Sequence, residues 1–539
     1  EERHHVALLN AEAGWKAQAA TAHRSAITYF TAALSLLPGE PWEREPELTF
    51  KLSLQRATSE FMSGNTAGAR HFVEELHPRA RTPSDLSAVS RLRSDIHLTT
   101  GETREAATCL LECLASLGMP MSPNPSWDEV EAANAEVWAL LGERPIESLL
   151  ELPLMTDPDM KAVMGVLAAL FTPALFTDNN LLVFHLSRMV LLTLRHGNSE
   201  AAAHGYAWYG IALGSSFKKY REGHAFGELA LALIERHDFS TSRAKVLYAM
   251  EILSSWTRPI ALSLEYIRGA FQHAGPAGDF QTACYCCNHI VTDRLALGHD
   301  LEEVYQESIA RLDFARKAGY QAVQQVIHHT QRYVQQLRGL SRAFNTLSGD
   351  DFEEEAFEAG LSPTHVSTMV CWYWIIKMQS RFMCGAYEEA RQASDRAEAL
   401  LWSSVGHIQL LDFHLYRALT LAACCEGATP EARQEYLEAM RRHQQQLEEW
   451  ASHCPGNFRA AERMVSAALA HRLGRNDEAM HTYEEALHSA CEHGFIQHIG
   501  LASELAARFW RERQVPTISL TYAREARESY RTWGAHGKV

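Results

Sequence analysis

The segment GAYEEARQASDRAEAL, residues 385–400, predicts the fold of this chain. It opens on Gly385, and Ala390, Ala393 and Ala397 follow with polar residues between them. Residues three and four apart share one face of an α-helix, so the three alanines line one side. Small residues on such a face let a second helix approach closely. We therefore expect residues 385–400 to form the second helix of an antiparallel pair, with VCWYWIIKMQSRFMC before it as the first helix.

The same pattern recurs at four other glycines, each followed by an alanine five residues later. The distance from Gly64 to Gly101 is 37 residues, from Gly385 to Gly427 it is 42, and from Gly427 to Gly474 it is 47. Tetratricopeptide and related helix-pair repeats have periods of about 34–47 residues. One pair cannot bury its own apolar stripe, so pairs must stack. The prediction is an all-α fold, an α-solenoid of about 12–14 helix pairs at ~40 residues each.

Local signals support helices and suggest where the chain divides. Ser126 and Glu129 form a capping-box pattern, and Thr82 and Thr429 each precede a proline, which is typical of a helix start. Two stretches interrupt the repeats: the proline-rich GMPMSPNPSW at 118–127 and the acidic NTLSGDDFEEEAFEAGLSPTH at 345–365. They predict three segments. These are N-terminal repeats at 1–118, a middle helical-repeat lobe at 119–345 and C-terminal repeats at 346–539.

Charge and hydropathy restrict the classes of partner. The chain has 539 residues and a net charge of −16, so it lacks the basic surface that nucleic acids and anionic membranes require. Its longest apolar run, residues 162–176, is 15 residues long and contains Pro173, whereas a membrane span needs about 20. This run is expected to be a buried helix. The 11 cysteines form no dense framework, and with a charged N-terminus they favour a cytoplasmic location.

No catalytic motif is found in the sequence. A phosphate loop, a kinase core, a metalloprotease helix and a zinc ribbon each need residues at fixed spacings that do not occur here. We therefore expect no enzymatic activity and no cofactor from this chain. In CYCCNH, Cys284 and Cys287 would share one helix face and Cys286 and His289 another. The four side chains cannot converge on one metal, so no metal site is predicted.

Aromatic side chains with polar tips are the candidates for ligand binding. CWYWII at 371–376 could be core or a stacking platform, and YAWYG at 206–210 could be core or one wall of a groove. With a nearby cation, such residues suit an apolar ligand that has an anionic or hydroxyl group. The candidate residues on the middle and C-terminal segments are Arg188, Tyr206, Tyr209, Trp256, Arg258, His414, Tyr416, Trp450 and Asn457. Packing in the core is the competing interpretation for all the aromatic ones.

Ordered stretches along the chain resemble one family, the bacterial multi-sensor serine/threonine–histidine kinases. The stretches are SLLPGEPW (35–42), PLMTDPDMKAVMGVLAALFTPALFTDNNL (153–181), RHGNSEAAAHGYAWYG (195–210), FHLYRAL (413–419), WASHCPGNF (450–458), AARFW (506–510) and YRTWGAHGKV (530–539). In that family a kinase-like domain and an AAA-type (STAND) ATPase precede a tetratricopeptide-like tract, and a GAF domain and a histidine-kinase core follow it. The resemblance implies that this chain is the helical-repeat tract, with the ATPase and kinase domains of the same polypeptide as its partners.

Three functions follow from these expectations. The first is a regulatory sensor and scaffold that binds a small-molecule or protein signal on a concave helical surface and relays it to the flanking domains. The second is the repeat region of a STAND-type transcriptional activator, in which a helix-turn-helix would follow the repeats. The third is a structural scaffold for protein interactions.

Overall fold

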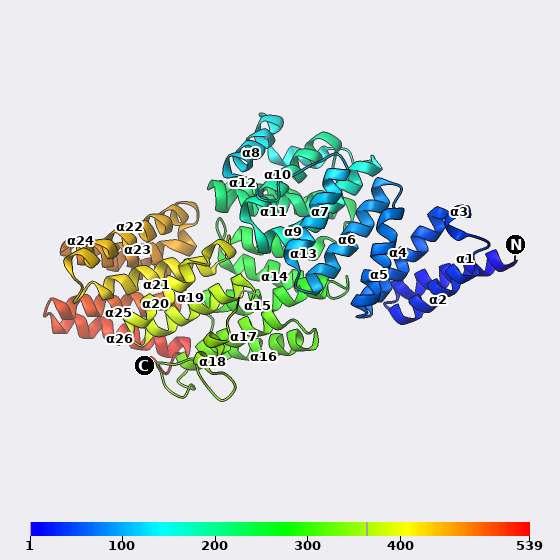
Figure 1. Cartoon of the computed structure of the whole chain (residues 1–539). Helices are drawn as coiled ribbons and strands as arrows, with labels where there is room; N and C mark the ends of the chain where they lie inside the picture. The colour runs from blue at the N-terminus through cyan, green and yellow to red at the C-terminus, as the bar shows by residue number, and fades with distance from the viewer. Residues whose placement is uncertain (1, 363–364) are drawn as a thin grey trace. The chain divides into compact units, whose positions relative to one another are not determined.

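The computed structural model describes residues 2–362 and 365–539, and these residues form an all-α fold (Figure 1). Within the described residues, extended pairing is limited to two isolated bridges, Leu154 with Asn198 and Gly349 with Phe352. Successive helices pack as antiparallel pairs, so the predicted all-α solenoid is confirmed. Pro363 and Thr364, which belong to the predicted break at 345–365, lie outside the described residues.

The chain divides into two compact units, Glu1–Gly205 and Tyr206–Val539. The first unit contains α1 (Glu2–Ala19), α2 (His23–Leu36), α3 (Pro41–Arg44), α4 (Pro46–Met62), α5 (Thr66–Leu76), α6 (Pro83–Thr99), α7 (Thr103–Ser116), α8 (Trp127–Leu141), α9 (Pro158–Thr177) and α10 (Asn179–His196), with 3₁₀ turns η1 (His77–Arg79) and η2 (Ile146–Glu151). Helix α11 (Glu200–Phe217) contains the boundary between the units.

The second unit continues with the longer part of the chain. Its helices are α12 (Tyr220–His237), α13 (Arg243–Ser254), α14 (Ile260–Ala274), α15 (Phe280–Ala296), α16 (Leu301–Lys317), α17 (Gln321–Leu337), α18 (Glu354–Ala359), α19 (Ser367–Met383), α20 (Tyr387–Glu398), α21 (Gln409–Cys424), α22 (Pro430–His453), α23 (Pro455–Arg472), α24 (Asn476–His493), α25 (Ile496–Glu512) and α26 (Pro516–Trp533), with the 3₁₀ turn η3 (Leu401–Ser403). The first predicted break falls in the α7–α8 connection, and the second falls between α17 and α19 and contains the short helix α18. The division into three segments stays a prediction.

The pair formed by α19 and α20 shows why the repeat has its sequence. Gly385 joins the two helices with a φ of 82°, a left-handed conformation that glycine adopts without steric cost. Ala390, Ala393 and Ala397 are all buried, and the Cys371 Sγ of α19 lies 3.7 Å from the Ala397 carbonyl oxygen of α20. The predicted close approach of these two helices is confirmed.

One repeat departs from this pattern, and its proline explains the departure. After Gly427, helix α22 begins at Pro430, capped by the Thr429 hydroxyl, whereas α20 begins two residues after its glycine. Ala439 is buried at the same offset as Ala397, and Leu437 is buried as well, whereas Ala432 and Tyr436 are only partly buried.

The apolar run at 162–176 lies in α9, which contains Pro173. By length and composition alone, α9 is the one helix among the described residues that could cross a membrane. Half of its most apolar window is buried, and α9 packs against α6, α7 and α10. This packing is typical of a core helix.

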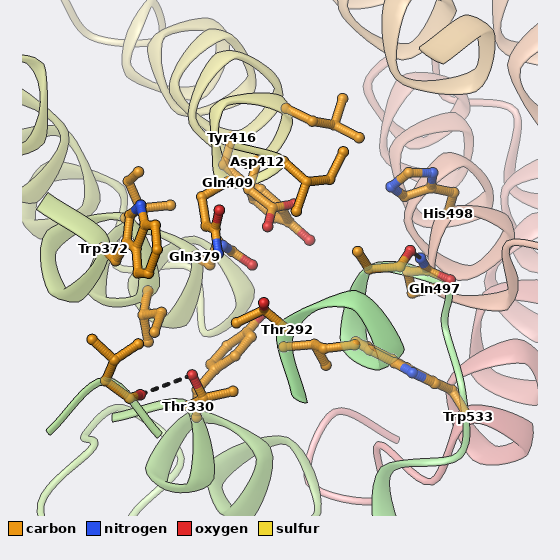
Figure 2. Close-up of a pocket in the computed structure, with 18 residues that line it drawn as sticks. Thr292, Thr330, Trp372, Gln379, Gln409, Asp412, Tyr416, Gln497, His498 and Trp533 are labelled. Carbon is orange, nitrogen blue, oxygen red and sulfur yellow. Dashed lines mark hydrogen bonds between the residues drawn. The ribbon is translucent and has the colours of Figure 1, made fainter. Parts of the chain in front are cut away.

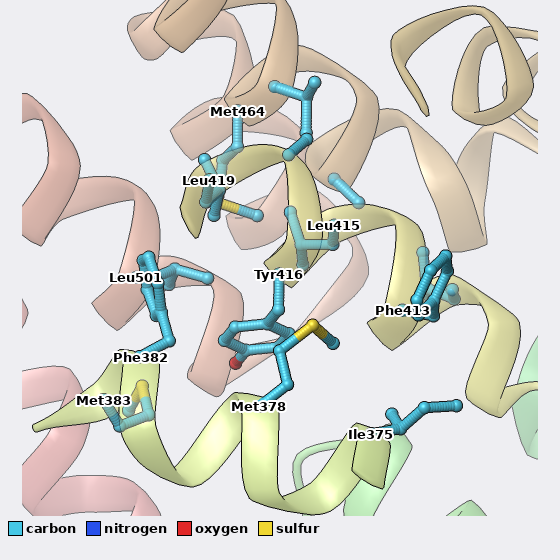
Figure 3. Close-up of a cluster of buried hydrophobic side chains, with 14 of the residues drawn as sticks. Ile375, Met378, Phe382, Met383, Phe413, Leu415, Tyr416, Leu419, Met464 and Leu501 are labelled. Atoms are coloured by element: carbon cyan, nitrogen blue, oxygen red, sulfur yellow. The ribbon is translucent and has the colours of Figure 1, made fainter. Parts of the chain in front are cut away.

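The core of the second unit is formed by helices that alternate along the chain. Phe382 and Met378 from α19, Tyr416 and Leu419 from α21, and side chains of α23 and α25 meet in one apolar cluster (Figure 3). Buried aromatic and aliphatic side chains of this size supply most of the stabilisation of such a stack.

Two glycines let α11 and α12 touch through their backbones. A Cβ added to Gly223 would lie 2.3 Å from the Gly210 oxygen, and a Cβ on Gly210 would lie 2.4 Å from the Gly223 oxygen. On Gly269 of α14, the nearest atom to an added Cβ is 3.5 Å away, so that site has room for a methyl group.

Gly223→Ala is therefore expected to destabilise the protein by roughly 1–3 kcal/mol, because two backbones must separate. Gly269→Ala is the matched control and should be neutral or stabilise by up to about 1 kcal/mol, since alanine favours helix over glycine. Thermal and urea unfolding of both variants measure the difference. Equal stability of the two variants would contradict the close backbone contact.

Candidate functional site

Arg188, one of the predicted ligand-binding residues, lies in the first unit and forms an ion pair. Its guanidinium lies 3.4 Å from Glu136 and over the ring of Phe184. The side chain is 36% exposed, so the pair is a surface interaction of small energy.

Tyr206 and Tyr209 lie in the core of the second unit. Both side chains are fully buried, and their rings pack on Phe226 of α12 with centroid distances of 5.8 Å and 5.2 Å. A ligand could reach them only if α11 and α12 separated. Their role in binding a ligand stays a prediction.

Trp256 and Trp450 meet in a cluster that we call the aromatic clasp, formed by Tyr220, Trp256, Trp450 and Phe458. Trp256 stacks on Phe458 at 5.3 Å with an interplanar angle of 9°, and its centroid lies 4.7 Å from that of Trp450. The indole Nε1 of Trp256 donates to the Gly406 carbonyl oxygen at 2.9 Å, and that of Trp450 donates to the Tyr220 hydroxyl at 3.0 Å. The clasp joins the turn after α13 to α22 and α23.

Asn457 closes the clasp with three hydrogen bonds. Its amide nitrogen donates to the carbonyl oxygens of Ser255 and Arg258, both at 2.7 Å, and its Oδ1 accepts from the Ile260 N–H at 3.2 Å. Asn457 therefore satisfies backbone groups in the turn before α14 and at its first residue. The guanidinium of Arg258 is half exposed and lies 3.8 Å from Glu228.

His414 lies between the clasp and a second buried histidine. Its Nδ1 is 2.9 Å from the Nδ1 of His443, and its ring lies 5.1 Å from that of Trp450. Burial lowers the pKa of His414 to about 4, so the ring is uncharged at neutral pH. Of the nine predicted residues, the structure thus brings together Trp256, His414, Trp450 and Asn457, as a packed contact between helices.

A pocket lies in the same unit, next to α21 (Figure 2). It holds about 810 Å³ of empty space, counted with the part that opens to solvent. Helices α15, α17, α19, α21, α25 and α26 contribute to its wall. Of the nine predicted residues, only Tyr416 lines it. Gln497 of α25 closes one side by donating to the Ala296 carbonyl oxygen of α15 at 2.7 Å.

Several polar atoms in this wall have no hydrogen-bond partner among the described residues. They are both amide atoms of Gln409, Oε1 of Gln497, Nδ1 of His498 and Nε1 of Trp533. Each of these four side chains is more than nine-tenths buried. Buried polar groups are normally paired, so this concentration of unpaired atoms is the unusual feature of the wall.

Asp412 is the single Asp, Glu, Lys or Arg that lines the pocket within the part of the chain that the structure describes. Burial raises the pKa of its carboxyl to about 7. A hydrogen bond from Gln379 acts in the opposite direction and offsets part of this rise in pKa. Across the pocket, burial lowers the pKa of His498 to about 4. Near neutral pH, the described wall therefore carries one carboxyl group and no cationic side chain.

The CYCCNH segment forms part of α15 behind this wall. Cys284 and Cys287 face an apolar cluster with α16 and α17, and Cys286 faces another with α14, as their spacing predicts. The His289 ring nitrogens lie 3.0 Å from Tyr248 and 3.0 Å from Glu251. Among the described residues, no three His, Cys, Asp or Glu side chains are grouped so that they could hold a metal ion.

Sequence reasoning missed Gln409 and Asp412 although a signal existed. Both precede Tyr416 on one face of α21, at spacings of three and four, within an otherwise apolar segment. A polar pair on a buried helix face is the unusual feature, whereas large aromatic residues there are ordinary core. Gln497 and His498 offered a weaker signal, because their helix carries many other polar residues.

The fold and this pocket define the class: a helical-repeat protein of tetratricopeptide-like helix pairs with an internal pocket. No protein-family model matches the chain.

Among known sequences, the chain is similar to hybrid signal transduction histidine kinase G of Dictyostelium discoideum, with 24% identity over 369 residues. The match covers 63% of this chain and 11% of that kinase, so the chain spans about a tenth of its relative's length.

Three solved structures match the chain at low similarity. A Rap protein complexed with Competence and Sporulation Factor has 10% identity and a TM-score of 0.38, with 84% of this chain and 99% of that chain covered. Yeast Tom70 has 13% identity and a TM-score of 0.25, with 96% and 98% covered. The tetratricopeptide domain of P58(IPK) has 14% identity and a TM-score of 0.20, with 94% and 99% covered.

Asn457→Ala is expected to destabilise the protein by roughly 1–3 kcal/mol or more, because it leaves buried backbone groups without partners. The exposed Asn345, changed to Ala, is the control and should alter stability by less than about 0.5 kcal/mol. Urea unfolding followed by tryptophan fluorescence compares the two. If Asn457→Ala were as stable as the control, the capping role would be excluded.

Asp412→Asn is expected to raise the melting temperature at about pH 8 and to lose that advantage as the pH falls towards 4. The folded carboxyl keeps its proton up to a pKa of about 7, whereas the unfolded one loses it near 3.8. Unfolding therefore releases a proton in this window, and the wild-type protein loses stability as the pH rises through it.

The matched control for this experiment is Asp350→Asn on the exposed loop before α18. Scanning calorimetry at several pH values should show no comparable pH-dependent gain for that variant. A pH-independent difference between Asp412→Asn and wild type would contradict the buried state of the Asp412 carboxyl.

Proposed function

We propose that this chain is the regulatory helical-repeat region of a signal-transduction histidine kinase, and that its second unit binds a signal in the pocket between α15, α21 and α25. The observation that carries the proposal is the set of buried polar atoms around the pocket that lack partners among the described residues, at Gln409, Gln497, His498 and Trp533. A region with a purely structural role would be expected to fill or pair these atoms.

Helix α21 would transmit the signal, because it lines the pocket and also contacts the aromatic clasp. Asp412 and Tyr416 line the pocket, while His414 on the same helix contacts Trp450 of the aromatic clasp. A ligand that moves α21 therefore changes the packing that joins α13 to α22 and α23. A change of that contact alters the curvature of the repeat stack, and flanking domains can respond to curvature.

The relative found in Dictyostelium supports the kinase context over a STAND-type transcriptional activator. In this proposal the chain contributes no catalytic group of its own, acts in the cytoplasm, and has ATPase, GAF and histidine-kinase domains of the same polypeptide as its partners. The bacterial arrangement of those domains is part of the proposal.

A pocket-filling substitution tests this function. Ala296 lines the pocket, and Ala296→Trp places an indole in the space that a ligand would occupy. In the full-length kinase, we expect this variant to change steady-state histidine phosphorylation by roughly five-fold or more, the lower end of typical allosteric coupling.

Ala310→Trp on the exposed face of α16 is the matched control, since it adds the same bulk outside the pocket. Circular dichroism and melting temperature confirm that both variants fold. If both folded variants matched the wild-type phosphorylation level under every growth condition, the pocket would have no regulatory role.

A further inference from the structure

The charge in the pocket restricts what the pocket can bind. Asp412 projects into it from α21, and no Lys or Arg of the described residues lines the wall (Figure 2). An anionic ligand would meet a carboxyl group and no Lys or Arg side chain of the described residues, which is unfavourable in a partly dehydrated site. A cation would gain a charge-assisted hydrogen bond to this carboxyl.

The hydrogen-bonding groups favour a donor in the same way. Among the described residues, the unpartnered acceptors include Oε1 of Gln409 and Oε1 of Gln497, and the Asp412 carboxyl, which already accepts from Gln379, also lines the pocket. The unpartnered donors are the amide of Gln409 and the indole Nε1 of Trp533, and Nδ1 of His498 donates or accepts according to its tautomer. An ammonium group brings two or three N–H donors and no acceptor, so it can bond the Asp412 carboxyl and the two amide oxygens.

The remaining wall suits an apolar body next to that cation. Trp372, Tyr333, Tyr416 and Trp533 contribute aromatic rings, and aliphatic side chains such as Ile376 fill the space between them. Aromatic faces attract cations and also bury hydrocarbon, so both parts of an amphipathic amine are accommodated.

From this arrangement we infer that the pocket binds a ligand that carries an ammonium group on an apolar body, with the ammonium on Asp412. This inference rests on the proposed function, because it specifies the chemical class of the signal that the same pocket would bind. Two sources share this chemistry, a free hydrophobic amine and the amino-terminal residue of a peptide, and the test below separates them.

Binding should depend on pH in one direction. Because the pKa of Asp412 is raised to about 7, an ammonium ligand must displace its proton at low pH, and the affinity rises between about pH 6 and pH 8. The other titratable groups that face the pocket do not change charge in this range. Burial lowers the pKa of His498 to about 4 and raises those of Tyr333 and Tyr416 above their usual value.

The experiment uses the 539-residue chain and three probes with one shared body: 2-phenylethylamine, 2-phenylethanol and phenylacetate. Calorimetry or tryptophan fluorescence at about pH 8 measures their affinities. We expect the amine to bind at least about ten-fold tighter than the alcohol, as a charge-assisted hydrogen bond predicts, and the carboxylate to bind most weakly. The tripeptide Phe-Gly-Gly, free and N-acetylated, forms the second arm.

Asp412→Asn should remove the preference for the amine over the alcohol, while Asp350→Asn keeps it. If the free tripeptide binds with higher affinity than the amine and its N-acetylated form does not bind, the ligand is the amino terminus of a peptide. Binding of the amine alone assigns a free amine. The inference is overturned if the amine does not bind, if the alcohol or carboxylate binds as tightly, or if Asp412→Asn leaves the preference unchanged.

These outcomes are distinct from failure of the proposed function. If Ala296→Trp still changes kinase phosphorylation while the amine fails to bind, the pocket regulates through another ligand chemistry. If the amine binds through Asp412 and Ala296→Trp has no effect on phosphorylation, the chemistry stands and the regulatory role fails.

Discussion

The contact between the turn after α13 and the start of α23 determines how the second unit is built. Trp256 stacks on Phe458, and Asn457 bonds three backbone groups that border α14. These residues are about 200 positions apart in the chain. In an ordinary helical repeat each pair contacts only its neighbours. Here a contact joins helix pairs that are distant in the chain, and the pocket likewise needs α15 and α25 to lie close enough for Gln497 to reach Ala296.

The fold could be predicted from sequence because the repeat pattern is local. Gly385 and the alanines after it define a helix pair through conformational freedom and side-chain size, and both act within one pair. The capping residues Ser126 and Thr82 behave as their patterns predict for the same reason. In α22, which begins one residue later at Pro430, Ala432 is only partly buried, although Ala439 is buried at the offset that the repeat predicts.

The site was harder to predict because it depends on contacts between distant pairs. Trp256, Trp450 and Asn457 were recognised as unusual, and the structure does bring them together, but tight packing and satisfied hydrogen bonds leave no space between them. The residues that do surround a space, such as Gln409 and Asp412, carry a local signal, two polar side chains on one face of α21, but that signal does not show that a cavity lies beside them. Whether a buried polar side chain meets a partner or a cavity depends on the curvature of the whole stack, which no local pattern encodes.

The closure of α25 onto α15 also bears on how the protein is made. The Gln497 and Ala296 partners are separated by 201 residues, so their contact belongs to the slow, non-local class even though each helix pair forms locally. Synthesis proceeds from the N-terminus, and Trp372 and Asp412 emerge long before His498 and Trp533. During that interval the nascent chain presents a half-built apolar wall with a carboxyl group in it, open to chaperones and to other chains, until the last two helices cover it.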